Sequence, residues 1–98
     1  MANRNRNFNE LVAKQMKDLE FAQGFLLANI EEHGDSVQDA LIAAIEATGL
    51  SAYADKNGFS IQSVSDFVHK RRECKVGTID KFLKPFGFKV RLDIEKVA

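Results

Sequence analysis

The side chains that could carry chemistry in this sequence are hydrogen-bond donors and acceptors between residues 51 and 75. An amide such as that of Gln62 can pair with adenine through two hydrogen bonds, and the hydroxyl of Ser63 can reach a base or a phosphate. Asp66 can accept a hydrogen bond from cytosine, although its charge repels phosphate. Lysine and arginine bind the phosphate backbone. The candidate DNA-contacting residues are Ser51, Lys56, Ser60, Gln62, Ser63, Asp66, Lys70, Arg71, Arg72 and Lys75.

Covalent catalysis has little support in the sequence. His33 and His69 lie far apart, and Cys74 is the only thiol. A site made from Cys74, His69 and an acid is conceivable, but both residues flank a basic turn with nothing to exclude water. Metal-ligand spacing and a glycine-rich phosphate loop are both missing. We therefore expect no enzyme activity, no cofactor and no small-molecule substrate.

Length and composition predict one domain of modest core size. The chain has 98 residues, of which 45% are hydrophobic, and a chain of this size usually forms a single domain. No apolar run is long enough to span a membrane, and the polar start "MANRNRNFNE" lacks the apolar core of a secretory signal. A single cysteine fits a reducing cytoplasm. We expect residues 1–7 to be a disordered polar tail and residues 8–98 to fold.

The charges are unevenly distributed although the formal net charge is zero. Eight acids and no lysine or arginine lie between Asp18 and Asp55, whereas nine bases and five acids lie between Ser60 and Ala98. Each region could be an ordinary solvated face, and the basic cluster from Lys70 to Lys75 could be a helix end favoured by the helix dipole. The acidic region could instead bind a basic protein through Glu20, Glu31, Glu32, Asp35 and Asp39.

Helical periodicity must supply the elements that position these residues. Apolar spacing and capping residues predict helices over residues of about 9–17, 18–33, 36–48, 51–57, 60–71 and 78–86. Pro85 should kink or close the last of these helices, because it lacks a backbone donor. The predicted N-caps are Asp18, Ser36, Ser51, Ser60 and Thr78, the predicted glycine ends are Gly34, Gly49, Gly58 and Gly87, and the second helix should bury Phe21, Phe25, Leu26 and Ile30.

The segment "YADKNGFSIQSVSDF" predicts two short helices that cross closely. Ala54 is small enough for the crossing, and Gly58 tolerates the positive φ of a tight turn. Val64, Phe67 and Val68 form an apolar ridge on the second helix, at spacings of three and four residues. This arrangement is typical of a helix-turn-helix unit, in which the second helix enters the major groove of DNA.

The ending "FKVRLDIEKV" alternates apolar and charged residues and predicts a strand over residues 88–97. No second strand is evident in the sequence, so the partner strand should come from another chain: a second copy or a different protein. The tail could instead pack against its own helices. We expect a homodimer, and truncation after Gly87 should abolish it. The predicted dimerisation residues are Phe88, Val90, Leu92 and Ile94.

The segment "GLSAYADKNGFSIQSVSDFVHKRRECKVGTIDKFLKPFGFKVRL" resembles the lambda repressor-like helix-turn-helix domain. Together with "DLEFAQGFLLANIEE" it is most similar to the addiction-module antidote proteins, the HigA-like antitoxins, over residues of about 18–95. The resemblance implies a mainly α fold of five to six helices with one C-terminal β-strand. It also implies a dimeric, sequence-specific DNA-binding repressor of its own operon that neutralises a basic RelE-like ribonuclease toxin. The alternative is a protein-interaction module that uses its acidic helices without binding DNA.

The sequence departs from this family at three positions. Ile61 replaces a polar or basic residue after the capping serine; we expect it to join the apolar ridge, or else to meet a thymine methyl group. Asp66 stands where relatives often carry lysine or arginine. Leu50 stands where related repressors often place a glutamine that binds phosphate. These departures weaken the expected affinity for DNA.

Overall fold

The computed structural model describes residues 10–70, 74–91 and 94–97, and over these residues the chain is mainly helical, as the sequence predicts. Residues 10–15 are helical, and the predicted tail at residues 1–7 lies outside the described part. Within the described ranges, no helix has both the length and the apolar character needed to cross a membrane. The following elements are α2 (Leu19–Glu31), α3 (Val37–Thr48), α4 (Leu50–Asn57), α5 (Ile61–Val68), α6 (Val76–Leu83) and the 3-10 helix η1 (Lys84–Phe86).

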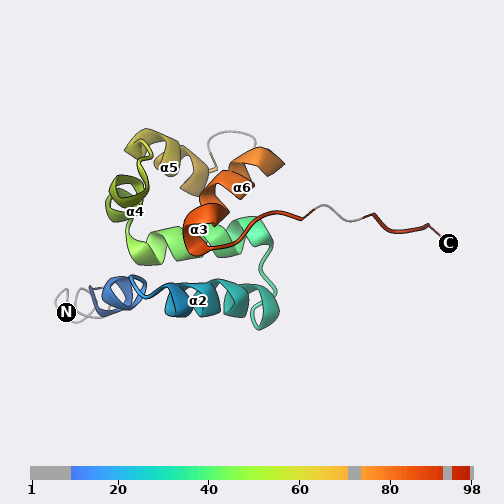
Figure 1. The fold of residues 1–98 in the computed structure, drawn as a ribbon, viewed down its shortest axis with the longest axis horizontal. Helices are drawn as coiled ribbons and strands as arrows, with labels where there is room; N and C mark the ends of the chain where they lie inside the picture. The colour runs from blue at the N-terminus through green and yellow to red at the C-terminus, as the bar shows by residue number, and fades with distance from the viewer. Residues whose placement is uncertain (1–9, 71–73, 92–93, 98) are drawn as a thin grey trace.

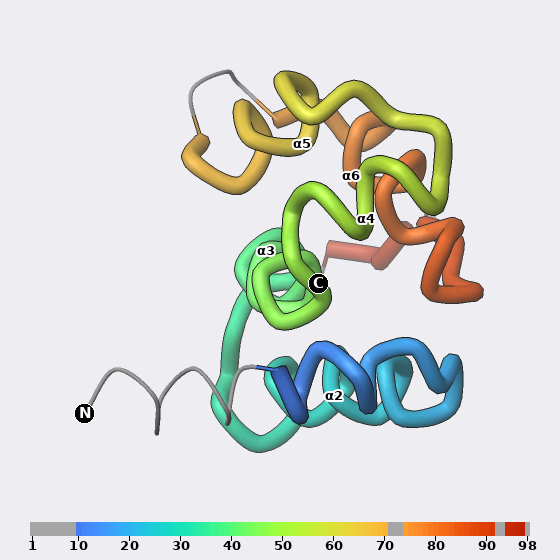
Figure 2. Tube along the Cα trace, turned by 90° about the vertical axis from the view of Figure 1, so that its left-hand side faces the viewer, coloured from blue at the N-terminus to red at the C-terminus, as the bar shows by residue number. Residues whose placement is uncertain are grey.

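Helix α3 is the centre of the molecule. It runs antiparallel to α2 on one side, and α4, α5 and α6 lie on its other side (Figures 1 and 2). Ala40, Leu41, Ala44 and Ile45 of α3 are fully buried. Because neighbours surround α3, it is apolar over most of its circumference, and the amphipathic helices around it bury one side each.

Side-chain caps begin three of the helices, as the sequence predicts. The Asp18 carboxylate accepts hydrogen bonds from the amides of Glu20 and Phe21 at the start of α2. Ser36 Oγ accepts from the Asp39 amide at the start of α3, at 3.1 Å. Ser60 Oγ accepts from the Ser63 amide at the start of α5, also at 3.1 Å. Each cap satisfies a backbone donor that has no partner within the helix.

The predicted cap at Ser51 is wrong, because α4 begins at Leu50 and leaves Ser51 inside its first turn. Gly49 serves both α3 and α4: its φ of 98° ends the first helix, and its carbonyl accepts the Tyr53 amide of the second. Gly49 alone therefore connects α3 to α4, and Ser51 does not act as a cap.

The predicted cap at Thr78 is also wrong. Helix α6 begins at Val76, because the extended backbone of Lys75 places its carbonyl to accept the amides of Thr78 and Ile79. The apolar stripe predicted for α2 is wrong at one position as well. Ala22 and Leu26 are buried there, whereas Phe21 is 38% exposed. Adjacent residues of a helix point roughly 100° apart, so a stripe displaced by one residue exposes Phe21.

An aromatic cluster fixes α4 and α5 to the C-terminal helices. The Tyr53 hydroxyl donates to the Phe82 carbonyl at 2.7 Å, and the Tyr53 ring stacks on Phe86 at 5.6 Å. Phe82 also contacts the rings of Phe59 and Phe67 at 5.1 and 4.9 Å. The last helical segment ends after Phe86, because Pro85 lies in η1 and Gly87 takes a φ of 81°, as the sequence predicts.

The C-terminal segment begins on the core and then leaves it. Phe88 and Val90 are half-buried against the core, and the Val90 amide donates to Asp80 Oδ1 at 2.9 Å. Further along, the side chains of Ile94 and Val97 are 98% and 90% exposed, and the trace of residues 94–97 lies away from the helices (Figure 1). Leu92 lies outside the described residues. Residues 88–91 and 94–97 form no strand, so the strand of residues 88–97 remains a prediction that requires a partner chain.

Two glycines should respond to alanine with opposite signs. Gly58 has a φ of 70°, so Gly58→Ala strains the backbone and should lower the free energy of unfolding by about 1 kcal/mol. Gly24 lies within α2, with no atom within 4 Å of a Cβ placed there, so Gly24→Ala should raise the free energy of unfolding by about 0.5–1 kcal/mol. Urea unfolding followed by circular dichroism checks both changes. Effects of the same sign would contradict this backbone account.

Candidate nucleic-acid interface

The turn between α4 and α5 has the local geometry that the sequence predicts. Gly58 takes a left-handed conformation (φ 70°, ψ 25°), and the Phe59 amide donates to the Ala54 carbonyl at 2.9 Å. Ala54 is 1% exposed, and the apolar ridge that begins at Val64 is buried. These contacts hold α5 on α4 and α3, and they determine which side of α5 faces outward. We refer to the two helices and their turn as the α4–α5 unit.

The outward side of α5 is exposed. Gln62, Ser63 and His69 are exposed, and Asp66 is half-buried. Ile61 is 49% exposed, so the expectation that it joins the ridge is wrong. Helical side chains lean toward the N-terminus, so a first-turn residue projects beyond the elements that bury Val64 one turn later. This places an apolar side chain beside Gln62 on the outward side of α5.

Hydrogen bonds along the helix order this outward side. Gln62 Nε2 donates to Asp66 Oδ1 at 2.8 Å. Ser60 Oγ donates to Ser63 Oγ at 2.8 Å while it caps the helix. Ser60 is therefore committed to the start of α5. The carbonyl oxygen of Gln62 accepts no hydrogen bond from the described residues, and Gln62 can exchange its carboxylate partner for a base. Asp66 thus acts on Gln62 as an intramolecular acceptor.

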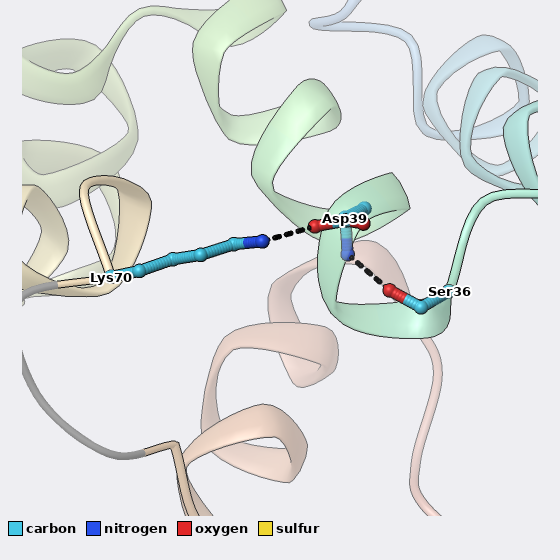
Figure 3. A network of polar contacts seen from close by, with 3 residues as sticks. All are labelled: Ser36, Asp39 and Lys70. Atoms are coloured by element: carbon cyan, nitrogen blue, oxygen red, sulfur yellow. Dashed lines mark hydrogen bonds and ion pairs between the residues drawn. The ribbon is translucent and has the colours of Figure 1, made fainter.

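Lys70 has an unusual backbone and a specific partner. Its φ of 54° is the only positive φ at a non-glycine residue in the described part of the chain. Its ammonium group lies 2.8 Å from Asp39 Oδ1, on the first turn of α3 (Figure 3). The hydrogen bond and the charge of Lys70 lower the pKa of Asp39 below its usual value. A predicted phosphate contact is thereby paired with a predicted partner-binding acid.

The remaining basic candidates occupy several places. Lys75 is exposed at the start of α6, and Arg71 and Arg72 lie outside the described residues. Ser51 is exposed in the first turn of α4. Lys56, in the last turn of α4, borders a hollow that also includes Met16, Leu19 and Pro85. The structure therefore places Lys56 on the α2 side of the α4–α5 unit rather than beside the outward side of α5.

The acidic candidates fall into two groups. Glu31 and Glu32 end α2, Asp35 lies in the connection, and Asp39 lies in the first turn of α3. Glu20 lies in the first turn of α2, eleven residues before Glu31, which corresponds to roughly 16 Å along a helix axis. Four of the five predicted residues therefore lie around the α2–α3 connection, and Glu20 lies at the other end of α2.

Lys81 is a cation beside α5 that the sequence analysis did not include. Its ammonium group lies over the rings of Phe59 and Phe82, at 5.1 and 5.3 Å from their centres. Burial raises the pKa of the nearby Cys74 thiol, which disfavours its reactive thiolate form. No local pattern marks Lys81, because α6 and α5 meet only in the folded chain. Lys81 and Cys74 border a cavity of about 200 Å³, which is also lined by Ser63, Asp66, Phe67, Thr78 and Phe82.

The described residues thus define a mainly helical chain with two short helices joined by a tight glycine turn, the second exposing a polar side. Comparison with protein-family models, with curated proteins and with solved structures finds no match.

Proposed function

We propose that this protein binds double-stranded DNA through α5 and acts as a sequence-specific transcriptional repressor. One observation supports this function most: the ridge beginning at Val64 is buried while Ile61, Gln62 and Ser63 at the start of α5 are exposed. Helix-turn-helix proteins contact base edges with the N-terminal residues of the second helix. The lambda repressor-like fold, with one C-terminal strand, is part of the same proposal.

In this proposal two of the three exposed residues at the start of α5 read bases. Gln62 exchanges its bond to Asp66 for adenine, and Ile61 contacts a thymine methyl group. Lys70 and Lys75 contact phosphate, together with the predicted contributions of Arg71 and Arg72. Because the formal net charge of the chain is zero, these local cations have to supply the attraction, and affinity should fall as salt rises.

The proposed repressor is a cytoplasmic homodimer. A single helix of this length contacts few base pairs, and two copies reading half-sites about 34 Å apart reach useful specificity. The exposed apolar side chains of Ile94 and Val97 support pairing of the C-terminal segments. Phe88 and Val90, two of the predicted dimerisation residues, pack on the core, so the proposed pairing region consists of the residues that follow Arg91.

The substitution Gln62→Ala tests base reading. The measurement is fluorescence anisotropy with a duplex from the DNA upstream of the coding sequence and with a scrambled duplex. Gln62→Ala should cost about 1–3 kcal/mol, or roughly five- to 150-fold, on the upstream duplex only. Gln15→Ala, at an exposed helical glutamine, is the matched control and should change neither affinity. If Gln62→Ala binds the upstream duplex as tightly as the unmodified chain does, base reading by α5 is wrong.

A second proposed function is binding of a basic protein, such as the toxin of a toxin–antitoxin pair whose operon this chain represses. Its support is the gathering of Glu31, Glu32 and Asp35 around the α2–α3 connection, within a stretch of the sequence, residues 18–55, that contains no lysine or arginine. Co-purification with the product of the adjacent gene tests it. Charge reversal of Glu31 and Glu32 should abolish that association and leave DNA binding intact, whereas an unchanged association would exclude this surface.

A further inference from the structure

We infer that Asp39 competes with DNA phosphate for Lys70, so that a carboxylate on α3 sets the affinity of the DNA site proposed on α5. The inference rests on the proposed function. It names an acidic residue outside the α4–α5 unit as a positioning residue for that site. The competition follows from the Lys70–Asp39 ion pair, from the backbone of Lys70 and from the chemistry that a carboxylate shares with a phosphate.

The ion pair joins segments that are distant in the sequence. Lys70 Nζ lies 2.8 Å from Asp39 Oδ1, and the backbone amide of Asp39 is held by Ser36 Oγ at 3.1 Å. Asp39 therefore belongs to a capped helix start with a fixed backbone, whereas Lys70 reaches it from the end of α5 (Figure 3). The pair holds the lysine ammonium group at α3.

The backbone of Lys70 argues that the lysine has a function. It follows the C-cap His69 of α5 with a φ of 54°, and glycine is the residue that usually occupies this left-handed position. A lysine there is strained relative to glycine. Residues held in such conformations tend to occur at binding sites and switches, so this outlier points to a role for the side chain.

Phosphate and carboxylate make the same demand on Lys70. Each offers anionic oxygens to an ammonium group, which binds either one as a point charge. The side chains of Lys70 and Asp39 are 57% and 48% exposed, so solvent and a duplex can both reach them. A phosphate that takes Lys70 must displace Asp39, and the loss of that ion pair offsets part of the gain.

The competition also links the two proposed binding surfaces. A basic partner that engages Asp39 would release Lys70 for phosphate, and DNA that takes Lys70 would leave Asp39 free for the partner. Coupling between two binding equilibria is reciprocal, so each ligand would strengthen binding of the other by the same factor. An exposed ion pair limits that factor to a few-fold.

A double-mutant cycle tests the inference with the full chain. The probes are the upstream duplex and a scrambled duplex, titrated over a series of salt concentrations. Asp39→Asn should raise the affinity about two- to fivefold at low salt, with a smaller gain at high salt. In a Lys70→Met background the same change should have no effect beyond that of Glu46→Gln. Glu46→Gln removes an equal charge two turns along α3 and measures the general electrostatic contribution, which the effect of Asp39→Asn should exceed.

Lys70→Gly provides a second readout that does not involve DNA. It should raise the melting temperature, because glycine relieves the left-handed strain, and it should lose sensitivity to Asp39→Asn in DNA binding. If Asp39→Asn changes affinity equally with and without Lys70, or lowers it, the competition is overturned while the proposed function stands. If the unmodified chain binds neither duplex, the proposed function fails and this inference fails with it.

Discussion

Phe82→Ala is expected to lower the free energy of unfolding by about 3–5 kcal/mol, as a buried phenylalanine typically does. Phe82 is 1% exposed, and its ring contacts Tyr53, Phe59 and Phe67. These three residues belong to α4, the turn and α5. Removal of the Phe82 ring therefore opens a cavity where the α4–α5 unit meets α6. Domains of this kind have a total stability of about 5–15 kcal/mol, and the variant should be partly unfolded at physiological temperature.

Urea unfolding followed by circular dichroism measures this loss. Phe21→Ala is the matched control: the same substitution on α2 removes a side chain that is 38% exposed, and it should cost about 1 kcal/mol or less. If Phe82→Ala and Phe21→Ala destabilise the chain equally, Phe82 is not the centre of the packing between α6 and the α4–α5 unit.

Deletion of residues 92–98 is expected to give a folded monomer that binds its operator about 100- to 10,000-fold more weakly, because linked binding of two half-sites is lost. The deletion keeps Phe88 and Val90 on the core and retains the bond from the Val90 amide to Asp80. The melting temperature should therefore change little. Sedimentation velocity measures the oligomeric state, and anisotropy with the upstream duplex measures affinity.

A cut after Gly87 would be a poorer test, because it also removes Phe88 and Val90 and so lowers stability. Ile94→Lys is a better companion to the deletion. It places a charge on a side chain that is 98% exposed in the single chain, so it should disrupt pairing without affecting the fold. A deletion variant that still sediments as a dimer would show that the dimer forms through another surface.

The residues that begin and end the helices were largely predictable from the sequence, and the failed predictions have physical causes. Asp18, Ser36 and Ser60 cap helices because each serine or aspartate acts on amides two or three residues away. Gly58 and Gly87 end helices for an equally local reason. Ser51 and Thr78 were wrong as caps because a neighbouring backbone, at Gly49 and at Lys75, begins the helix earlier. Several residues in one region can each begin a helix, and packing selects among them.

The candidate site was less predictable, because its details are tertiary. Nothing in the sequence around Lys70 indicates Asp39, which lies on another helix, and nothing around Lys81 indicates the rings of Phe59 and Phe82. The exposure of Ile61 depends on where the neighbours of α5 end. Helical periodicity identified the ridge from Val64 to Val68, but it could not show which charged groups the fold brings to the ends of α5.

The contact between Tyr53 and Phe82, which joins α4 to α6, also gives the chain an internal optical probe. The protein has one tyrosine and no tryptophan, so its tyrosine absorbance comes from a single ring that is 2% exposed. Burial raises the pKa of Tyr53 above its usual value, since the neutral phenol is favoured there. Ionisation of the phenol in alkali should therefore require α4 and α6 to separate around Tyr53. An ultraviolet titration of the unlabelled protein would follow that separation directly.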